Sequence, residues 1–196
     1  MSRRRPLRWK TDSELVSAAG EGDREAATLL LERHYDRIAV ISRRMMASPT
    51  DAEDATQQAL IAVSRGLRGF DGRSAVSTWI HRVTVNACLD ELRKSARRPL
   101  PVDPVDQAER GASFEPDHAG VISDRDAIDH AMSQVAVEFR TAVVLRDVCG
   151  LDYDEIAAIL DIPGGTVRSR ISRGRRELRD RLGNQQGVGG VQGLEP

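Results

Sequence analysis

The side chains most able to do chemistry are arginines and hydroxyls in a helical pattern near the C-terminus. Apolar residues recur there at the spacing of one helix face, and polar residues near the same helix N-terminus project elsewhere. Arginine pairs bidentately with guanine, and serine or threonine hydroxyls bond to bases or phosphates. The sequence therefore predicts that this helix contacts DNA. The apolar stripe is Val167, Ile171, Gly174, Leu178 and Leu182, and the polar set is Arg168, Ser169, Ser172 and Arg173.

The residues ahead of that helix complete a helix-turn-helix pattern. Asp152 is expected to cap a short helix, Pro163-Gly164-Gly165 to form a turn, and Thr166 to cap the longer basic helix. In this motif the second helix enters the major groove by its N-terminal residues, which leaves later arginines for phosphates. A solvated basic helix is the plain alternative, but the capped partner helix and tight turn favour DNA binding. The later arginines are Arg175, Arg176 and Arg179.

A second constellation lies in the first half of the chain, after a loop that contains Gly72. At 100° per residue, one arc of a helix carries an aromatic ring, an amide and two guanidinium groups. Such a set suits an extruded base, which needs stacking, an edge partner and fixed flanking phosphates. The alternative, slightly favoured by spacing alone, is a core tryptophan with surface charges around it. The arc comprises Trp79, Arg82, Val83, Asn86, Asp90 and Arg93.

Four helices are expected to position this first constellation. They run from Thr11 to Gly20, from Asp23 to Ser48, from a cap at Thr50-Asp51-Ala52-Glu53 onward, and from Ser77 to Arg98, where Pro99 stops the last. The apolar stripe of the second helix is predicted to comprise Ala27, Leu31, Ile38, Ile41 and Met45. That of the third is predicted to comprise Ala52, Ala55, Ala59, Val63 and Leu67.

The composition then changes between 99 and 123 to prolines and acids, which is typical of a flexible linker. Helical periodicity resumes from about 124 and carries the helix-turn-helix to 182, and strand-like alternation is not evident. The fold is therefore predicted to be all-α, with two small helical domains joined by a flexible acidic linker. A basic tail is expected at 1–11 and a disordered tail at 183–196.

Composition and charge narrow the function. The net charge of −1 and pI near 6.4 argue against unspecific coating of nucleic acid, although basic and acidic residues are segregated along the chain. No apolar run approaches the roughly 20 residues of a membrane span, so a cytoplasmic protein without membrane insertion is expected. Cys88 and Cys149 are isolated, and the 4 histidines are scattered. The sequence therefore indicates no metal site, no cofactor and no small-molecule substrate, and we do not expect an enzyme.

These motifs, in order, resemble an extracytoplasmic-function sigma factor of the sigma-70 family. The resemblance covers nearly the whole chain apart from the two tails and the linker, and 75–93 is most similar to the actinobacterial SigM subgroup. The sequence departs from common members at Gln58, where an acid is usual, and at Gly164 in the turn. The matching motifs are Asp51-Ala52-Glu53-Asp54 with Gln57, the Phe70-x-Gly72-x-Ser74 loop, Trp79, Asn86, Asp90 and Arg93, Tyr153-Asp154-Glu155-Ile156-Ala157 and Gly165-Thr166-Val167-Arg168-Ser169-Arg170.

The resemblance implies an alternative, stress-responsive sigma factor that binds core RNA polymerase and promoter DNA and is controlled by an anti-sigma factor. Residues 12–98 would be region 2, which binds the polymerase clamp and the −10 element, and 124–182 region 4, which binds the −35 element. Polymerase contacts would come from Asp51, Glu53, Asp54, Gln57 and Gln58. Contacts to the −10 element would come from Phe70, Trp79, Arg82, Asn86 and Arg93, and those to the −35 element from Thr166, Arg168, Ser169, Ser172, Arg173 and Arg176.

A conventional helix-turn-helix regulator that binds DNA without polymerase is the competing class. Such a regulator needs a sensor or dimerisation domain ahead of its DNA-binding domain. The first domain shows neither a ligand-binding sheet pattern nor a long heptad seam.

Overall fold

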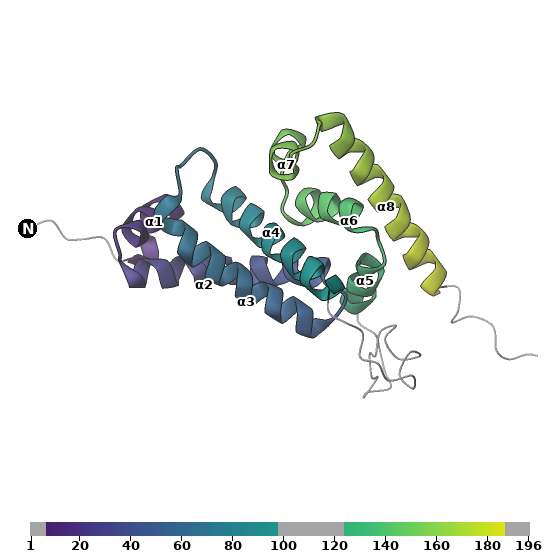
Figure 1. The fold of residues 1–196 in the computed structure, drawn as a ribbon, viewed down its shortest axis with the longest axis horizontal. Helices are drawn as coiled ribbons and strands as arrows, with labels where there is room; N and C mark the ends of the chain where they lie inside the picture. The colour runs from purple at the N-terminus through teal and green to yellow at the C-terminus, as the bar shows by residue number, and fades with distance from the viewer. Residues whose placement is uncertain (1–6, 98–123, 187–196) are drawn as a thin grey trace, which may run out of the picture. The chain divides into compact units, whose positions relative to one another are not determined.

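The computed structural model describes residues 7–97 and 124–186, and the chain divides into two compact units, Met1–Arg98 and Pro99–Pro196. Within the described residues every regular element is helical (Figure 1), which confirms the all-α prediction. The predicted linker, most of the basic tail and the segment after Gln186 lie outside the described residues. Each unit is described by itself below.

The first unit comprises four α-helices and two short 3-10 turns. They are η1 (Leu7–Trp9), α1 (Asp12–Gly20), α2 (Arg24–Met45), α3 (Pro49–Gly66), η2 (Leu67–Gly69) and α4 (Val76–Arg97). Helix α3 packs against both α2 and α4 (Figure 1). The predicted capping box opens α1, because the Glu14 N–H donates to Thr11 Oγ1 at 3.3 Å and the Thr11 N–H donates to Glu14 Oε2 at 2.7 Å.

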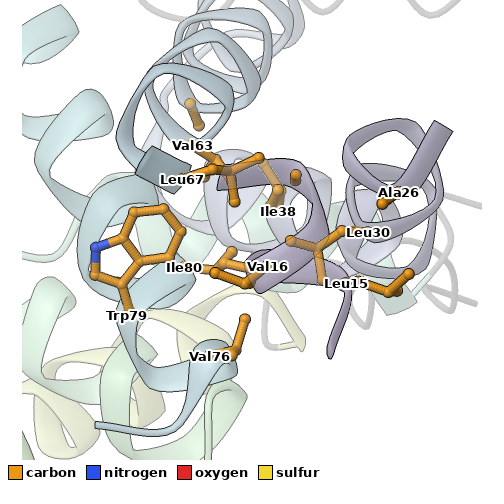
Figure 2. Close-up of a cluster of buried hydrophobic side chains, with 12 residues drawn as sticks. Leu15, Val16, Ala26, Leu30, Ile38, Val63, Leu67, Val76, Trp79 and Ile80 are labelled. Atoms are coloured by element: carbon orange, nitrogen blue, oxygen red, sulfur yellow. The ribbon is translucent and has the colours of Figure 1, made fainter. Parts of the chain in front are cut away.

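One buried cluster holds the N-terminal unit together (Figure 2). Leu15 of α1, Leu30 and Ile38 of α2, Val63 of α3 and Ile80 of α4 are completely buried within it. The α3 stripe predicted from the sequence is confirmed, since all five of its members are buried. Burial of this kind contributes about 25 cal/mol for each Å² of apolar surface and is the main force that associates these helices.

The predicted stripe of α2 is correct in its second half and shifted by one residue in its first. Ala26 and Leu30 are fully buried, whereas Ala27 and Leu31 are only partly buried. At 100° per residue the buried residues Ala26, Leu30, Ile38, Ile41 and Met45 lie within one arc of about 120°. The buried stripe is therefore wider than the predicted one, and its first half begins one residue earlier.

The predicted cap of α3 is wrong by two residues. Ser48 caps the helix, because its Oγ accepts from the Asp51 N–H at 3.1 Å, and Pro49 occupies the first turn. Proline is well suited there, since the first amides of a helix have no intrahelical acceptor. The Ser-Pro pair that was predicted to end α2 therefore starts α3, and α2 itself already ends at Met45.

The second unit comprises α5 (Asp124–Ser133), α6 (Val137–Val143), the π-helical turn η3 (Val144–Val148), α7 (Tyr153–Leu160) and α8 (Gly164–Gln186). The expected helix, turn and helix are α7, the loop through Asp161 and α8 (Figure 1). Asp152 caps α7 as predicted, accepting from the Glu155 N–H at 2.8 Å. Asp161 takes the left-handed conformation, with φ 51°, and ends α7.

Helix α8 differs from the prediction at both ends. It begins at Gly164, and the Thr166 N–H bonds to the Pro163 carbonyl at 2.8 Å, so Thr166 lies in the first turn and is not the cap. It ends at Gln186, past the predicted end at Leu182. Glycines at 164 and 165 concealed the start, because glycine is a poor helix former.

Gly174 permits close packing of α8 on α6. A Cβ at this position would lie 2.6 Å from Val143 Cγ2 and 3.0 Å from the Phe139 carbonyl oxygen. Gly174→Ala is therefore expected to destabilise the C-terminal unit by about 1–2 kcal/mol, because this overpacking exceeds the gain in helix propensity. Unfolding of the full chain by denaturant, followed by circular dichroism, measures the change.

Gly183→Ala is the matched control on the same helix. A Cβ there would have nothing within 4 Å, so this substitution should stabilise the chain by about 0.5–1 kcal/mol. Equal effects from the two substitutions would contradict a packing role for Gly174.

Candidate DNA and polymerase interfaces

The start of α8 presents the predicted DNA-binding side chains to solvent. Val167, Ile171 and Gly174 are buried, and Leu178 and Leu182 are partly buried, so the helix packs by its apolar stripe as expected. Arg168, Ser169, Ser172, Arg173 and Arg176 are exposed. Thr166 is half-buried, and its carbonyl accepts from Ser169 Oγ at 2.9 Å. The polar members of the proposed −35 surface are thus brought together on the first turns of one helix.

Aromatic rings from other elements contact two of these arginines. The Arg168 guanidinium lies 5.8 Å from the centre of the Tyr153 ring, and that of Arg173 lies 5.9 Å from the centre of the Phe139 ring. Arg146 of η3 also packs on Tyr153, at 5.1 Å, and donates from NH1 to the Leu151 carbonyl at 2.7 Å. A guanidinium over an aromatic face is attracted by the ring quadrupole. Sequence reasoning missed Arg146 and the aromatic partners because contacts between different elements leave no local pattern.

Arg175 has a different role from its neighbours on α8. Its Nε donates to Asp147 Oδ2 at 3.0 Å, and NH2 donates to the other carboxylate oxygen. The hydrogen bonds that Arg175 donates to the Asp147 carboxylate raise the pKa of Arg175, because they stabilise its charged form. The expectation that Arg175 contacts phosphate like Arg176 and Arg179 is not favoured, since its donors are directed to a carboxylate within the unit.

In the first unit, Trp79 is a core residue. It is only 8% exposed and belongs to the main buried cluster, as Figure 2 shows. Phe70 meets it edge-on with ring centres 5.4 Å apart, and a Cβ at Gly66 would lie 2.7 Å from the indole. The structure therefore favours the core alternative for Trp79. Its ring packs against Phe70 and Gly66, so almost none of it is open for stacking on a base.

The polar members of the α4 constellation are exposed, whereas Val83 is half-buried and packs against the core cluster. Arg82, Asn86 and Arg93 lie on the solvent side of the helix, and Arg93 pairs with Asp90 at 2.6 Å. The preceding loop contains Gly72 in the left-handed region, with φ 72°, and the Arg73 N–H bonds to Asp71 Oδ1 at 3.1 Å. An exposed amide is thus retained on the same side of α4 as the Arg82 and Arg93 guanidinium groups.

Helix α3 presents the third polar surface. Glu53, Gln57 and Gln58 are exposed, whereas Asp51 and Asp54 are half-buried. Ile61, one turn after Gln57 and Gln58, is 42% exposed and was not singled out from the sequence. An exposed large apolar side chain beside polar ones is common in protein interfaces. The five predicted residues and Ile61 all belong to one helix.

The described residues hold no group of three or more histidine, cysteine, aspartate or glutamate side chains placed to bind a metal ion. Within those same two stretches, 7–97 and 124–186, none of the helices is long and apolar enough to cross a membrane. Cys88 is buried and its thiol lies 3.8 Å from Ser42 Oγ.

Two helical units, one with a helix-turn-helix and one with exposed polar surfaces on α3 and α4, define the class of helical transcription factors. Family models narrow the class: Sigma-70 region 2 matches residues 30–98, and Sigma-70, region 4 matches residues 125–178. Among curated proteins, the chain is 36% identical to the ECF RNA polymerase sigma factor SigM of Mycobacterium tuberculosis, over 89% of this chain and 86% of that protein. It is also 36% identical to the ECF RNA polymerase sigma-E factor of Escherichia coli, over 88% of this chain and 94% of the relative.

The chain therefore belongs to the extracytoplasmic-function sigma factors of the sigma-70 family, and the resemblance drawn from its motifs is confirmed. It binds core RNA polymerase and promoter DNA, as members of this family do. A SigM factor is among its relatives, but equal identity to sigma-E means that identity does not separate the subgroups.

Solved structures agree on the fold. The sigma factor RpoE from Bartonella quintana, crystallised with the anti-sigma factor NepR, matches with a TM-score of 0.61 and 23% identity. The match covers 78% of this chain and 93% of that one. Membership of the family removes the conventional regulator as a competing class.

Proposed function

We propose that α3 binds core RNA polymerase, that the exposed side of α4 contacts the −10 element and that α8 contacts the −35 element. The observation that carries this assignment is that most of the polar residues matching the family are exposed, on helices whose opposite sides are buried. Purified chain added to core polymerase should start transcripts downstream of one two-part motif across the genome. DNA binding without polymerase, and no such transcripts, would contradict it.

The regulation and setting follow from the same family. We infer a factor that acts in the cytoplasm, where core polymerase and promoters are found, has no catalytic activity of its own, and is held inactive by an anti-sigma factor until a stress signal arrives. The complex of RpoE with NepR supports the inhibitor. Purification of the tagged chain from unstressed cells should recover a partner other than polymerase. Recovery of polymerase alone would remove the inhibitor from the proposal.

Among the exposed arginines of α8, we expect Arg173 to contact a base and Arg176 to contact a phosphate. Arg173 lies near the helix N-terminal end, which enters the groove in a helix-turn-helix, whereas Arg176 lies nearly one turn later. Arg173→Ala is expected to cost roughly 1–3 kcal/mol on the preferred −35 sequence and little on a single-base variant. Binding of the holoenzyme to matched promoters, measured at several salt concentrations, checks this.

Arg176→Ala is the matched control for the Arg173 experiment. Loss of a phosphate contact should weaken binding to every −35 sequence alike and make the salt dependence shallower. If Arg173→Ala gives that same uniform pattern, Arg173 is a phosphate contact and its proposed role is wrong.

The exposed side of α4 supports a contact to a −10 base. Asn86 has an amide that can donate and accept, and the guanidinium groups of Arg82 and Arg93 can hold the flanking phosphates. Asn86→Ala should lower open-complex formation about tenfold on the preferred base and relax the preference at one promoter position.

Permanganate footprinting on promoters that differ at single −10 positions measures this effect of Asn86. Equal loss on all base variants would show that Asn86 has only a structural role. Trp79 is assigned to the scaffold beneath Phe70, because its ring is buried.

A further inference from the structure

The helix-turn-helix contains an aromatic ring, that of Tyr153, which is not among the residues proposed to contact the −35 element. Tyr153 is the first residue of α7, its side chain is half-buried, and the Arg168 guanidinium packs over its ring. We propose that Tyr153 is a positioning residue that holds Arg168 in the orientation needed to contact the −35 element. The proposal rests on the proposed role of Arg168.

The ring is itself held by two features of the unit. Arg146 packs on it with the guanidinium 5.1 Å from the ring centre, and Arg146 is in turn held by its hydrogen bond to the Leu151 carbonyl. The backbone on which Tyr153 stands is fixed by the capping box between Asp152 and Glu155. A ring held by its helix cap and by a second guanidinium offers Arg168 a rigid surface and not another mobile side chain.

A carboxylate compensates for part of the repulsion between the two guanidinium groups at the Tyr153 ring. Asp147, the neighbour of Arg146, binds Arg175 of α8 with both carboxylate oxygens and ties η3 to α8. This carboxylate offsets part of the positive charge that Arg146, Arg168 and Arg175 bring together. Arg168 is exposed, so the outer side of its guanidinium remains available to DNA.

An arginine held before binding loses less conformational freedom when it reaches a base. A free arginine side chain has several rotatable bonds, and ordering them on DNA weakens binding. Stacking on a fixed aromatic ring restricts these bonds in advance. The planar guanidinium can stack and still donate in its own plane, so the contact with Tyr153 and a contact to guanine are compatible.

A double-mutant cycle tests the proposal with the holoenzyme. Tyr153→Leu removes the ring, Tyr153→Phe keeps it, and Arg168→Ala removes the group that is positioned. Tyr153→Leu should weaken binding to the preferred −35 sequence about two- to fivefold, and Tyr153→Phe should stay close to the unaltered chain. In the Arg168→Ala background, Tyr153→Leu should have little further effect.

The possible outcomes distinguish a positioning role of Tyr153 from a merely structural one. They also show whether Arg168 contacts the −35 element at all. If Arg168→Ala leaves binding to the preferred sequence unchanged, the assignment of Arg168 itself is wrong. If Arg168→Ala weakens binding but Tyr153→Leu has no effect, or has the same effect in both backgrounds, Tyr153 does not position it.

A measurement on the unaltered chain covers the case in which Tyr153→Leu does not fold. The Nε–H order parameter of Arg168, measured by nuclear magnetic resonance, should exceed that of the exposed Arg176 on the same helix. Equal values would overturn the proposal.

Discussion

Trp79→Ala is expected to destabilise the N-terminal unit by about 3–5 kcal/mol. The indole is 8% exposed, contacts the edge of Phe70 and lies close against Gly66, so its removal leaves a cavity between α3, α4 and the loop. A loss of this size approaches the whole stability of a small domain. The variant should therefore populate partly unfolded chain at physiological temperature and lose promoter opening as a consequence.

The second tryptophan of the chain provides the matched control. Trp9 of η1 is 59% exposed and the Arg8 guanidinium lies over its ring at 5.2 Å, so Trp9→Ala should change stability by less than about 0.5 kcal/mol. Denaturant unfolding of both variants by circular dichroism gives the comparison. In a Trp9→Phe background the remaining emission reports on Trp79 alone. Unchanged stability of Trp79→Ala, together with a lost −10 preference, would return Trp79 to the base-contacting set.

Trp79 also shows how far sequence can locate a site. Helical spacing gives the positions of Trp79, Arg82, Asn86 and Arg93 around the axis of one helix. It does not tell how deeply each side chain is buried. Gly66, the last residue of α3, has no side chain, and this leaves room for the indole to pack into the cluster. That packing depends on another helix, so the spacing along α4 could not predict it.

The elements themselves were predictable because their causes are local. Thr11 with Glu14 and Asp152 with Glu155 form capping boxes within four residues, and each begins a helix where the sequence placed one. By contrast, the ion pair of Arg175 with Asp147 joins positions 28 residues apart. A run of arginines looks uniform in sequence, yet the structure divides it into a pair within the unit, two arginines on aromatic rings and others in solvent.

Charge reversal on α3 is the second change with a large expected effect. Glu53→Lys combined with Asp54→Lys should lower affinity for core polymerase by about tenfold or more, because it places positive charge where the proposed interface carries negative charge. Glu53 is exposed and Asp54 is half-buried, and neither belongs to the buried stripe of α3, so the fold should persist. Circular dichroism should show unchanged helical content, and titration of labelled core enzyme should measure the affinity.

A control variant with the same change in charge separates a specific contact from a general electrostatic effect. Glu21→Lys with Glu25→Lys alters two exposed acids near the start of α2, and like the test variant it places lysine in or near a first helical turn. This control should bind core polymerase nearly as well as the unaltered chain at physiological salt, where distant surface charges are screened.

Ile61→Ala then tests whether the polymerase-binding surface of α3 acts through charge alone or also through an apolar contact. Its exposed side chain follows Gln57 and Gln58 on α3, and burial of an isoleucine in an interface contributes about 1.5–3 kcal/mol. If α3 docks on polymerase, Ile61→Ala should weaken binding with a salt dependence unlike that of the charge reversal, since apolar burial is not screened. Undiminished binding of both the Glu53/Asp54 double variant and Ile61→Ala would show that another surface of the chain binds the enzyme.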